Sequence, residues 1–162
     1  MKIKYLDSSR KTVLVVNAEF PVPTILNAAA HTVLGLVAAN VPSAWSLLPY
    51  PSPAFGANCH ISEYPVVVLR AKRSSQLERL VLQLKEANIL HNVFIDSMVG
   101  ASATEQQSAT LSARPGESRV VCIGLFGEEE AIRPAIKSFS LYKTSDALSH
   151  APQSAHEGPA TS

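Results

Sequence analysis

Cysteine is scarce in this sequence, and its placement excludes two kinds of site. The only cysteines are Cys59 and Cys122, which lie far apart and have no CxxC spacing, so neither a disulfide framework nor a zinc site is indicated. Long apolar runs are also missing, since no segment approaches the ~20 apolar residues that span a bilayer and no export signal is recognisable. We therefore expect a soluble cytoplasmic protein with no metal site and no membrane partner.

Excess charge and aromatic residues are scarce as well. The formal net charge is +1 and aromatics make up 6% of the sequence, so long-range attraction for a polyanion is weak. No aromatic residue lies within the one basic group to stack a base; its members are Arg70, Lys72, Arg73 and Arg79. We therefore expect no nucleic-acid partner. Nucleotide-binding loops and nucleophile elbows are absent too, so the sequence indicates no cofactor.

Apolar residues, by contrast, make up 46% of the sequence, and the large ones are mostly Val, Leu and Ile. This composition favours β-branched strands packed under helices. Short apolar runs predict buried strands at four places, which are 12–17, 66–69, 92–96 and 119–125. Periodic apolar residues and capping signals predict helices over about 24–40 and 75–88, with another after Glu128. We therefore expect an α/β fold with a four-stranded mixed sheet flanked by helices.

The same pattern suggests how the chain is divided. Residues 1–10 are expected to be a poorly ordered lead-in and 11–142 a single α/β domain. Residues 143–162 are rich in Ser, Ala and Pro and poor in large apolar groups, which predicts a flexible tail. Residues 41–63 contain four prolines, and we interpret them as a long irregular loop that serves as a lid or a subunit contact.

The first predicted helix carries the candidate site. Thr24 can cap its first turn, and Asn27 and His31 lie four residues apart on one face. His31 is the candidate for proton transfer because imidazole titrates near neutral pH, and Asp96, at the end of the third predicted strand, can orient it. Asn17 follows the first strand, where loops commonly form ligand crevices. We predict that His31 and Asp96 are catalytic and that Asn17, Thr24 and Asn27 bind the ligand.

The residues leave other interpretations of this helix open. A helical histidine beside alanines is often a packed residue whose ring nitrogens bond to the backbone. Small residues such as Ala28 and Gly35 also let another segment or subunit approach the helix closely, which predicts a homo-oligomer as an alternative. The leading interpretation is an uncharacterised protein that binds an unknown small polar ligand or a protein partner at a His/Asp/Asn corner.

The order of elements and several segments resemble a known fold. These segments are VLVVN at 13–17, NAAAHTVLGL at 27–36, PVVVLRA at 65–71, Asp96, and PGESRVVCIGLFG at 115–127. Over about 11–142 the chain resembles the type II peptidyl-tRNA hydrolase fold. It is more closely similar to a family of uncharacterised bacterial proteins, a domain of unknown function, within that fold superfamily.

The resemblance implies a peptidyl-tRNA hydrolase II-like fold and one alternative function. Type II hydrolases carry a GK pair before this helix and a Gln within an AQxxHA stretch. Here the corresponding places read PT at 23–24 and NA at 27–28, while His31 is kept. The alternative is therefore an esterase with a degenerate active site, in which His31 with Asp96 activates water and a basic residue from elsewhere replaces the missing lysine.

Overall fold

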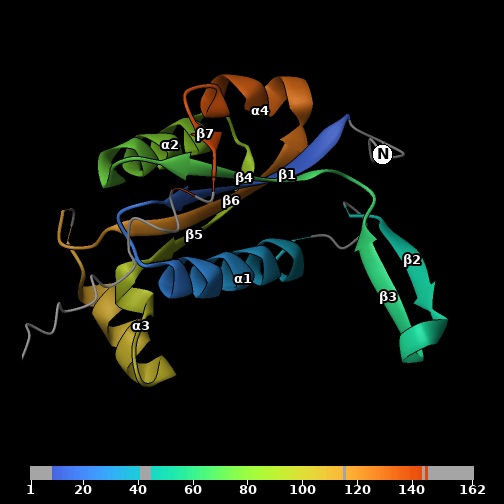
Figure 1. Ribbon diagram of the computed structural model, residues 1–162. Coiled ribbons are helices and arrows are strands. Elements are labelled where there is room, and N and C mark those ends of the chain that lie inside the picture. The colour runs from blue at the N-terminus through green and yellow to red at the C-terminus, as the bar shows by residue number, and fades with distance from the viewer. Residues whose placement is uncertain (1–8, 41–44, 115, 144, 146–162) are drawn as a thin grey trace, which may run out of the picture.

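A five-stranded mixed sheet with helices on both faces forms the body of the protein (Figure 1). The structure is a computed structural model that describes residues 9–40, 45–114, 116–143 and 145. Most of the expected lead-in and tail, and residues 41–44 of the expected loop, lie outside the described residues.

The strand order in the sheet is β5-β6-β1-β4-β7. The strands are β1 (Arg10–Asn17), β4 (Val66–Ala71), β5 (Leu90–Ile95), β6 (Val120–Glu128) and β7 (Ser140–Leu141). β1 runs parallel to β4, and all other neighbours are antiparallel. The carboxyl ends of β1, β4 and β5 therefore meet the amino end of β6 at one end of the sheet.

The α/β class and the mixed sheet are confirmed, but the predicted number of four strands is wrong. β7 is the fifth strand, and it pairs Ser140 and Leu141 with Arg70 and Leu69 at the outer edge of β4. Two residues are too few to show a strand period, so nothing in the sequence pattern marked it. The expected central strand is confirmed, because β1 is buried from Thr12 to its end.

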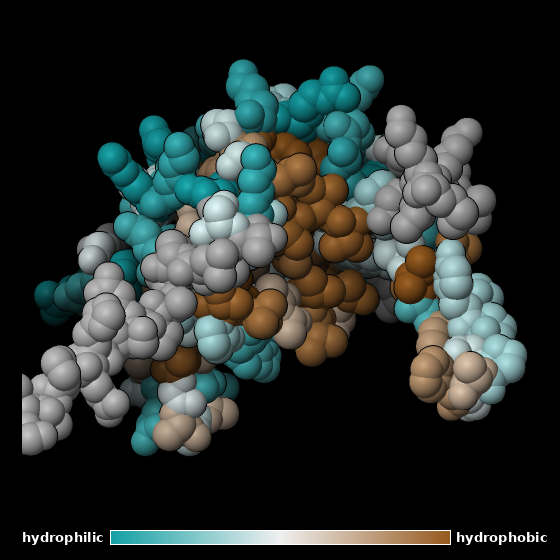
Figure 2. All heavy atoms as spheres, viewed as in Figure 1, coloured by the Kyte–Doolittle hydropathy of each residue, from teal (hydrophilic) through white to brown (hydrophobic). Residues whose placement is uncertain are grey.

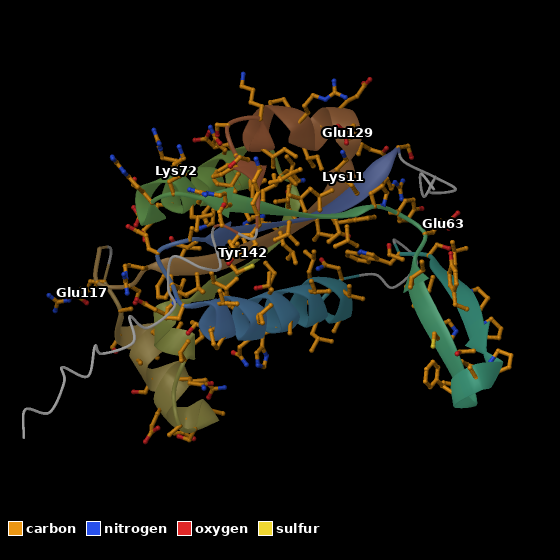
Figure 3. The ribbon with its side chains drawn as sticks, in the orientation of Figure 1. Lys11, Glu63, Lys72, Glu117, Glu129 and Tyr142 are labelled. Carbon is orange, nitrogen blue, oxygen red and sulfur yellow. The ribbon has the colours of Figure 1, made fainter. Side chains whose placement is uncertain are left out.

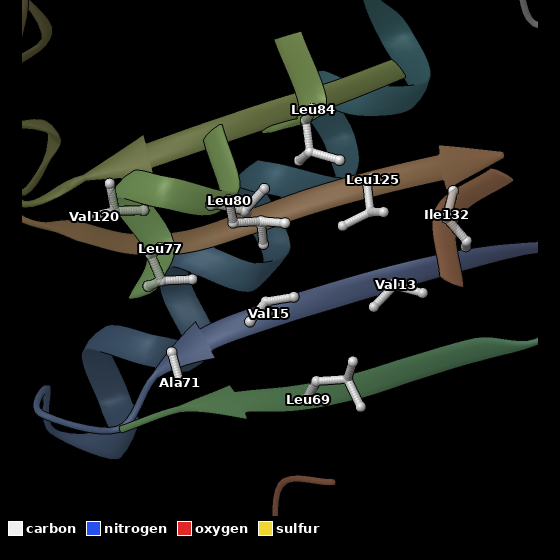
Figure 4. Close-up of a cluster of buried hydrophobic side chains, with 11 residues drawn as sticks. Val13, Val15, Leu69, Ala71, Leu77, Leu80, Leu84, Val120, Leu125 and Ile132 are labelled. Atoms are coloured by element: carbon white, nitrogen blue, oxygen red, sulfur yellow. The ribbon is translucent and has the colours of Figure 1, made fainter. Parts of the chain in front are cut away.

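Helices cover both faces of the sheet (Figure 1). One face carries α1 (Val22–Ala38), with α3 (Ala103–Ser112) beyond it, and the other carries α2 (Ser74–Glu86) and α4 (Glu129–Ile136). Figure 4 shows Leu77, Leu80 and Leu84 of α2 lying over side chains of β1, β4 and β6. At about 1.5–3 kcal/mol for each fully buried leucine, this layer is a major source of stability.

The far end of the sheet is closed by charge pairs. Lys11 at the start of β1 forms an ion pair with Glu129, the first residue of α4 (Figure 3). A carboxylate at this position also lies favourably for the helix dipole. Arg10 and Glu128 form a second pair at 2.6 Å beside it. These contacts hold the start of α4 at the end of the sheet opposite the carboxyl ends of β1, β4 and β5.

α1 packs closely on the sheet because small residues face each other there. Its buried residues are Ile25, Ala28, Thr32 and Leu36. A Cβ added to Gly124 of β6 would lie 2.7 Å from Thr32 Cγ2, which is closer than real contacts allow. The small-residue face of α1 is thus occupied by its own sheet, so a homo-oligomer would need another surface.

The segment expected to be an irregular loop contains a hairpin instead. β2 (Leu47–Ser52) and β3 (Ala57–Ser62) pair antiparallel, and a single 3-10 turn, η2 (Pro53–Phe55), joins them. Prolines suggested a loop, but the outer edges of a two-stranded ribbon tolerate proline because no partner needs its missing N–H. The hairpin stands away from the body (Figure 1), and Trp45 anchors its base by stacking on Phe126 at 4.5 Å between ring centroids.

Candidate functional site

An open pocket of about 1070 Å³ lies between α1, β5 and α3. Its polar lining consists of Asn27, His31, Asn92, Gln106, Gln107 and Thr110. Its apolar lining includes Phe94, Met98, Val99 and Leu111. Among the described residues, no carboxylate, ammonium or guanidinium group lines it, and His31 supplies its one imidazole. The pocket is therefore an amide-rich, uncharged hollow.

His31 and Asn27 reach this pocket from α1. The four-residue spacing places both on the flank of the helix that faces β5. The imidazole stacks on Phe94, with ring centroids 5.9 Å apart and planes 26° from parallel. His31 is exposed, and within the described part of the chain no hydrogen bond engages its ring. This geometry contradicts the interpretation of His31 as a packed histidine and leaves its nitrogens available.

Two other amides shape the pocket and are already bonded. Asn92 Nδ2 donates to the Thr32 carbonyl at 3.1 Å, and Gln106 Nε2 donates to the Gly100 carbonyl at 2.9 Å. The Asn92 amide also lies against Gly35, where an added Cβ would clash with Nδ2. The sequence analysis did not predict Asn92 as a pocket residue because it lies within a predicted strand. The available signal was that Asn92 is a polar residue in an otherwise apolar strand.

Asp96 lies outside the pocket lining. It begins a short 3-10 turn, η3 (Asp96–Met98), after β5. Its Oδ1 accepts a hydrogen bond from the backbone amide of Arg119 at 3.0 Å, and its Oδ2 lies 3.5 Å from Arg119 Nε. The structure therefore brings Asp96 to the start of β6, and no described contact joins its carboxylate to His31.

Asn17 is a buried organising residue at the polar end of the sheet. Its Nδ2 donates to Ser74 Oγ and to the Val120 carbonyl, both at 2.9 Å, and its Oδ1 accepts from the Glu19 amide at 3.0 Å. The side chain joins the ends of β1, β6 and α2; both amide hydrogens are used, and the residue is fully buried, which closes it to a ligand. The structure thus places Asn17 away from the pocket.

Thr24 also lies outside the pocket lining, within the first turn of α1. The prediction that it caps the helix is wrong, because α1 begins at Val22 after Pro21 and no side-chain cap is present. Proline is tolerated in a first helical turn because the missing N–H has no partner there. Pro23 therefore lies within α1, whereas the predicted helix began after it.

A family model matches residues 10–143 and carries the description "Protein of unknown function (DUF2000)". The chain belongs to this family. A solved structure described as the protein of unknown function Atu0240 from Agrobacterium tumefaciens strain C58 is similar, with 21% identity and a TM-score of 0.69. The match covers 85% of this chain and 100% of that chain. No curated protein matches.

These comparisons confirm part of the predicted resemblance. Membership in DUF2000 confirms a family of unknown function, and the match spans the predicted domain almost completely. The likeness to the solved structure, at its low identity, shows the fold alone. Neither description names a peptidyl-tRNA hydrolase, so the hydrolase II-like classification stays a prediction.

Two charged residues of this DUF2000 chain at the polar end of the sheet, Glu19 and Arg119, are held by contacts within the chain. Glu19 Oε2 accepts hydrogen bonds from both the backbone amide and the hydroxyl of Ser74, each at 2.9 Å. These bonds lower the pKa of Glu19, and the nearby Arg119 charge adds to the effect. The Arg119 guanidinium lies 4.4 Å from the centre of the Phe20 ring. This end of the sheet is held by internal contacts, which favours a structural role.

Metal and thiol chemistry have little support in the described part of the chain. No group of three or more His, Cys, Asp or Glu side chains lies together there. Burial raises the pKa of the Cys122 thiol to about 12, so this thiol stays protonated at neutral pH. Cys59 is exposed on the hairpin. Among the described helices, none has the length and apolar character to cross a membrane.

Proposed function

We propose that this DUF2000 domain binds a small uncharged polar molecule in the pocket beside His31. The observation that carries the proposal is the lining itself, which combines amides and an imidazole with apolar side chains and, as far as the structure describes the chain, has no fixed charge. A charged ligand would lose hydration there without gaining a counter-ion, which is costly. A neutral ligand with hydrogen-bonding groups on one edge and an apolar face matches the lining.

The open polar groups suggest the shape of this ligand. Asn27 and Gln107 line the pocket, and the side chain of each offers a donor and an acceptor. The stacked pair of His31 and Phe94 supplies a flat aromatic surface nearby. Amide-bearing heterocycles satisfy both features, because their edges carry paired donors and acceptors and their rings are flat.

The test uses neutral and charged molecules of matched shape. Nicotinamide and uracil are the neutral probes, and nicotinate and orotate are their carboxylate counterparts. Calorimetry and thermal shift on the full chain should show binding of a neutral probe and not of its counterpart. Mass spectrometry of molecules released from freshly purified protein adds an unbiased search for a natural ligand of the same class.

Variants test whether the probe binds in this pocket. His31→Ala and Asn27→Ala should each weaken binding of a neutral probe by about tenfold, the value of one hydrogen bond of about 1.4 kcal/mol. His60→Ala and Asn58→Ala are matched controls, since both residues are exposed on β3 outside the pocket. Equal binding by the native chain and His31→Ala, or preference for the carboxylates, would contradict the proposal.

A peptidyl-tRNA hydrolase-like esterase is the second candidate, and the accessible imidazole of His31 favours it. In this alternative His31 activates water for attack on the ester. The pocket supplies no cation for RNA phosphates, and the Asp96 carboxylate is engaged by Arg119. Hydrolysis of peptidyl-tRNA that disappears in His31→Ala would support an esterase. Hydrolysis by the native chain and by His31→Ala that is no faster than in buffer alone would count against it.

A further inference from the structure

The hairpin of β2 and β3 forms an arm that the other described residues leave uncovered. All of its residues are exposed or half-buried, and its contacts with the other described elements are slight. Its exposed large apolar side chains are Tyr50 and Ile61 on one face of the ribbon, Phe55 at the turn, and Leu47 on the opposite face. Phe55 at the turn is 86% exposed. An isolated two-stranded hairpin is marginally stable in water, so the arm favours a partner surface.

A second uncovered apolar surface lies where β4 runs beside α1. Val66 and Val68 pair with Thr12 and Leu14 of β1 and therefore point to the α1 side of the sheet. α1 packs mainly over β5, β6 and β1, and its contacts with β4 are slight at most. Val66 and Val68 are 48% and 38% exposed. Within the described residues, the outer edge of β4 is paired by the two residues of β7 and by the Tyr142 amide, which donates to the Val68 carbonyl at 3.0 Å.

The flank of α1 next to β4 is apolar as well. Leu26, Val33 and Val37 recur at helical spacing on the flank opposite Asn27 and His31. Leu26 is 65% exposed, and the two valines are half-buried. We call the combined surface the shoulder; its residues are Leu26, Val33, Val37, Val66 and Val68. Figure 2 shows apolar side chains across this part of the molecule and a second apolar group on the arm.

We propose that two copies of this chain form a two-fold symmetric dimer in which each arm lies on the shoulder of the other copy. One chain carries both apolar surfaces, so a dimer has two arms and two shoulders. If each arm lies on the shoulder of the other copy, all four surfaces are covered and no further copy can add. The arm begins beside Phe126 and stands apart from α1 in its own chain (Figure 1). The shoulder and the His31 pocket lie on opposite flanks of α1, so the dimer is independent of the proposed ligand.

The area available matches a stable dimer. A buried aliphatic side chain removes roughly 60–120 Å² of apolar surface from water, and a Phe or Tyr removes more. The exposed parts of the shoulder side chains and of Tyr50, Phe55 and Ile61 on the arm together amount to roughly 650 Å² per copy, which is near the lower end of the share that each partner buries in a standard interface.

Sedimentation of the full chain at micromolar concentration tests the proposal. The native chain should be a dimer, and Phe55→Asp on the arm and Leu26→Glu on the shoulder should each sediment as monomers. Both residues are exposed within one chain, so circular dichroism should show an unchanged fold. Leu82→Glu is the matched control, because Leu82 is 59% exposed on α2, away from both surfaces, and it should stay dimeric.

Mixing the two monomeric variants distinguishes arm exchange from other dimers. In a mixed pair the native arm of Leu26→Glu meets the native shoulder of Phe55→Asp, so one of two contacts is restored. A heterodimer weaker than the native dimer by more than about tenfold should therefore form. No pairing on mixing would contradict exchange and point to arm-to-arm or shoulder-to-shoulder contact. A monomeric native chain, or dimers that survive both substitutions, would overturn the proposal.

Discussion

Asp96 and Arg119 are joined by one bond between their backbones, one from the Arg119 backbone amide to the Asp96 carboxylate, and one ion pair between their side chains. The Asp96 amide donates to the Arg119 carbonyl at 3.0 Å, and the Arg119 amide donates to Asp96 Oδ1 at 3.0 Å. The pair closes the sheet just beyond the irregularity in pairing between Phe94 and Ile95 of β5. The carboxylate thus continues the β5–β6 ladder where regular pairing ends.

Replacing Asp96 by alanine should destabilise the protein. The variant leaves the Arg119 amide without its acceptor and removes an ion pair, so the free energy of unfolding should fall by about 1–3 kcal/mol. Asp96→Asn keeps an acceptor oxygen and should lose less. Urea unfolding followed by circular dichroism measures both. A loss of equal size in the two variants would mean that the charge, and not the hydrogen bond, is the important feature.

Gly124→Ala should disturb the packing of α1 on the sheet. The new methyl group would meet Thr32 Cγ2 at 2.7 Å, and overpacking of this kind costs about 1–3 kcal/mol. Thr32→Ser removes that methyl, so the double variant should recover part of the loss. The measurement is a double-mutant cycle of unfolding free energies. Strict additivity would show that α1 shifts without touching Gly124.

Glu19→Ala should lower stability by about 1 kcal/mol at neutral pH, as loss of a helix-capping acceptor does. Ser74 hydrogen bonds hold the pKa of Glu19 below its ordinary value in the folded protein. The ionised carboxylate therefore stabilises the fold above the ordinary Glu pKa, and this contribution is lost as pH falls toward the lower folded-state pKa. The difference in free energy of unfolding between the native chain and Glu19→Ala, measured by urea unfolding across this pH range, should narrow on acidification. A gap that widens would contradict this.

The two thiols should differ sharply in reactivity. Cys59 is exposed, whereas Cys122 is buried in β6 with its pKa raised to about 12. In the Phe55→Asp variant, whose arm is uncovered, a chromogenic disulfide reagent should therefore titrate one thiol per folded chain and the second only after unfolding. Cys59→Ser should abolish the fast reaction. Rapid reaction of both thiols in native protein would show that β6 opens far more readily than its burial indicates.

Much of the fold followed from apolar patterning. Runs such as 12–17 were recognisable because both faces of a central strand are covered, so consecutive residues are apolar. The hairpin was missed because Pro49 and Pro51 resemble loop residues, and their tolerance at a ribbon edge depends on tertiary context. β7 was missed because two residues carry no periodicity.

Only the part of the candidate site that α1 contributes was predictable from the sequence. The four-residue spacing of Asn27 and His31 placed them on one flank, and both line the pocket. A helix around 102–111 was predictable, but its place as a wall of the pocket was not, since α3 buries none of its residues and shows no apolar face. Asp96 was expected beside His31 because a strand end can point to either neighbour, and only the pairing with β6 directs it toward Arg119.

The hairpin enters and leaves the body at one point, where the Glu63 amide donates to the Ser46 carbonyl at 2.9 Å (Figure 3 shows Glu63). An excursion whose two ends meet can lengthen, shorten or be exchanged without moving the strands on either side. Within the described residues, 47–62 are therefore a segment whose length can change while the strands of the sheet stay in register.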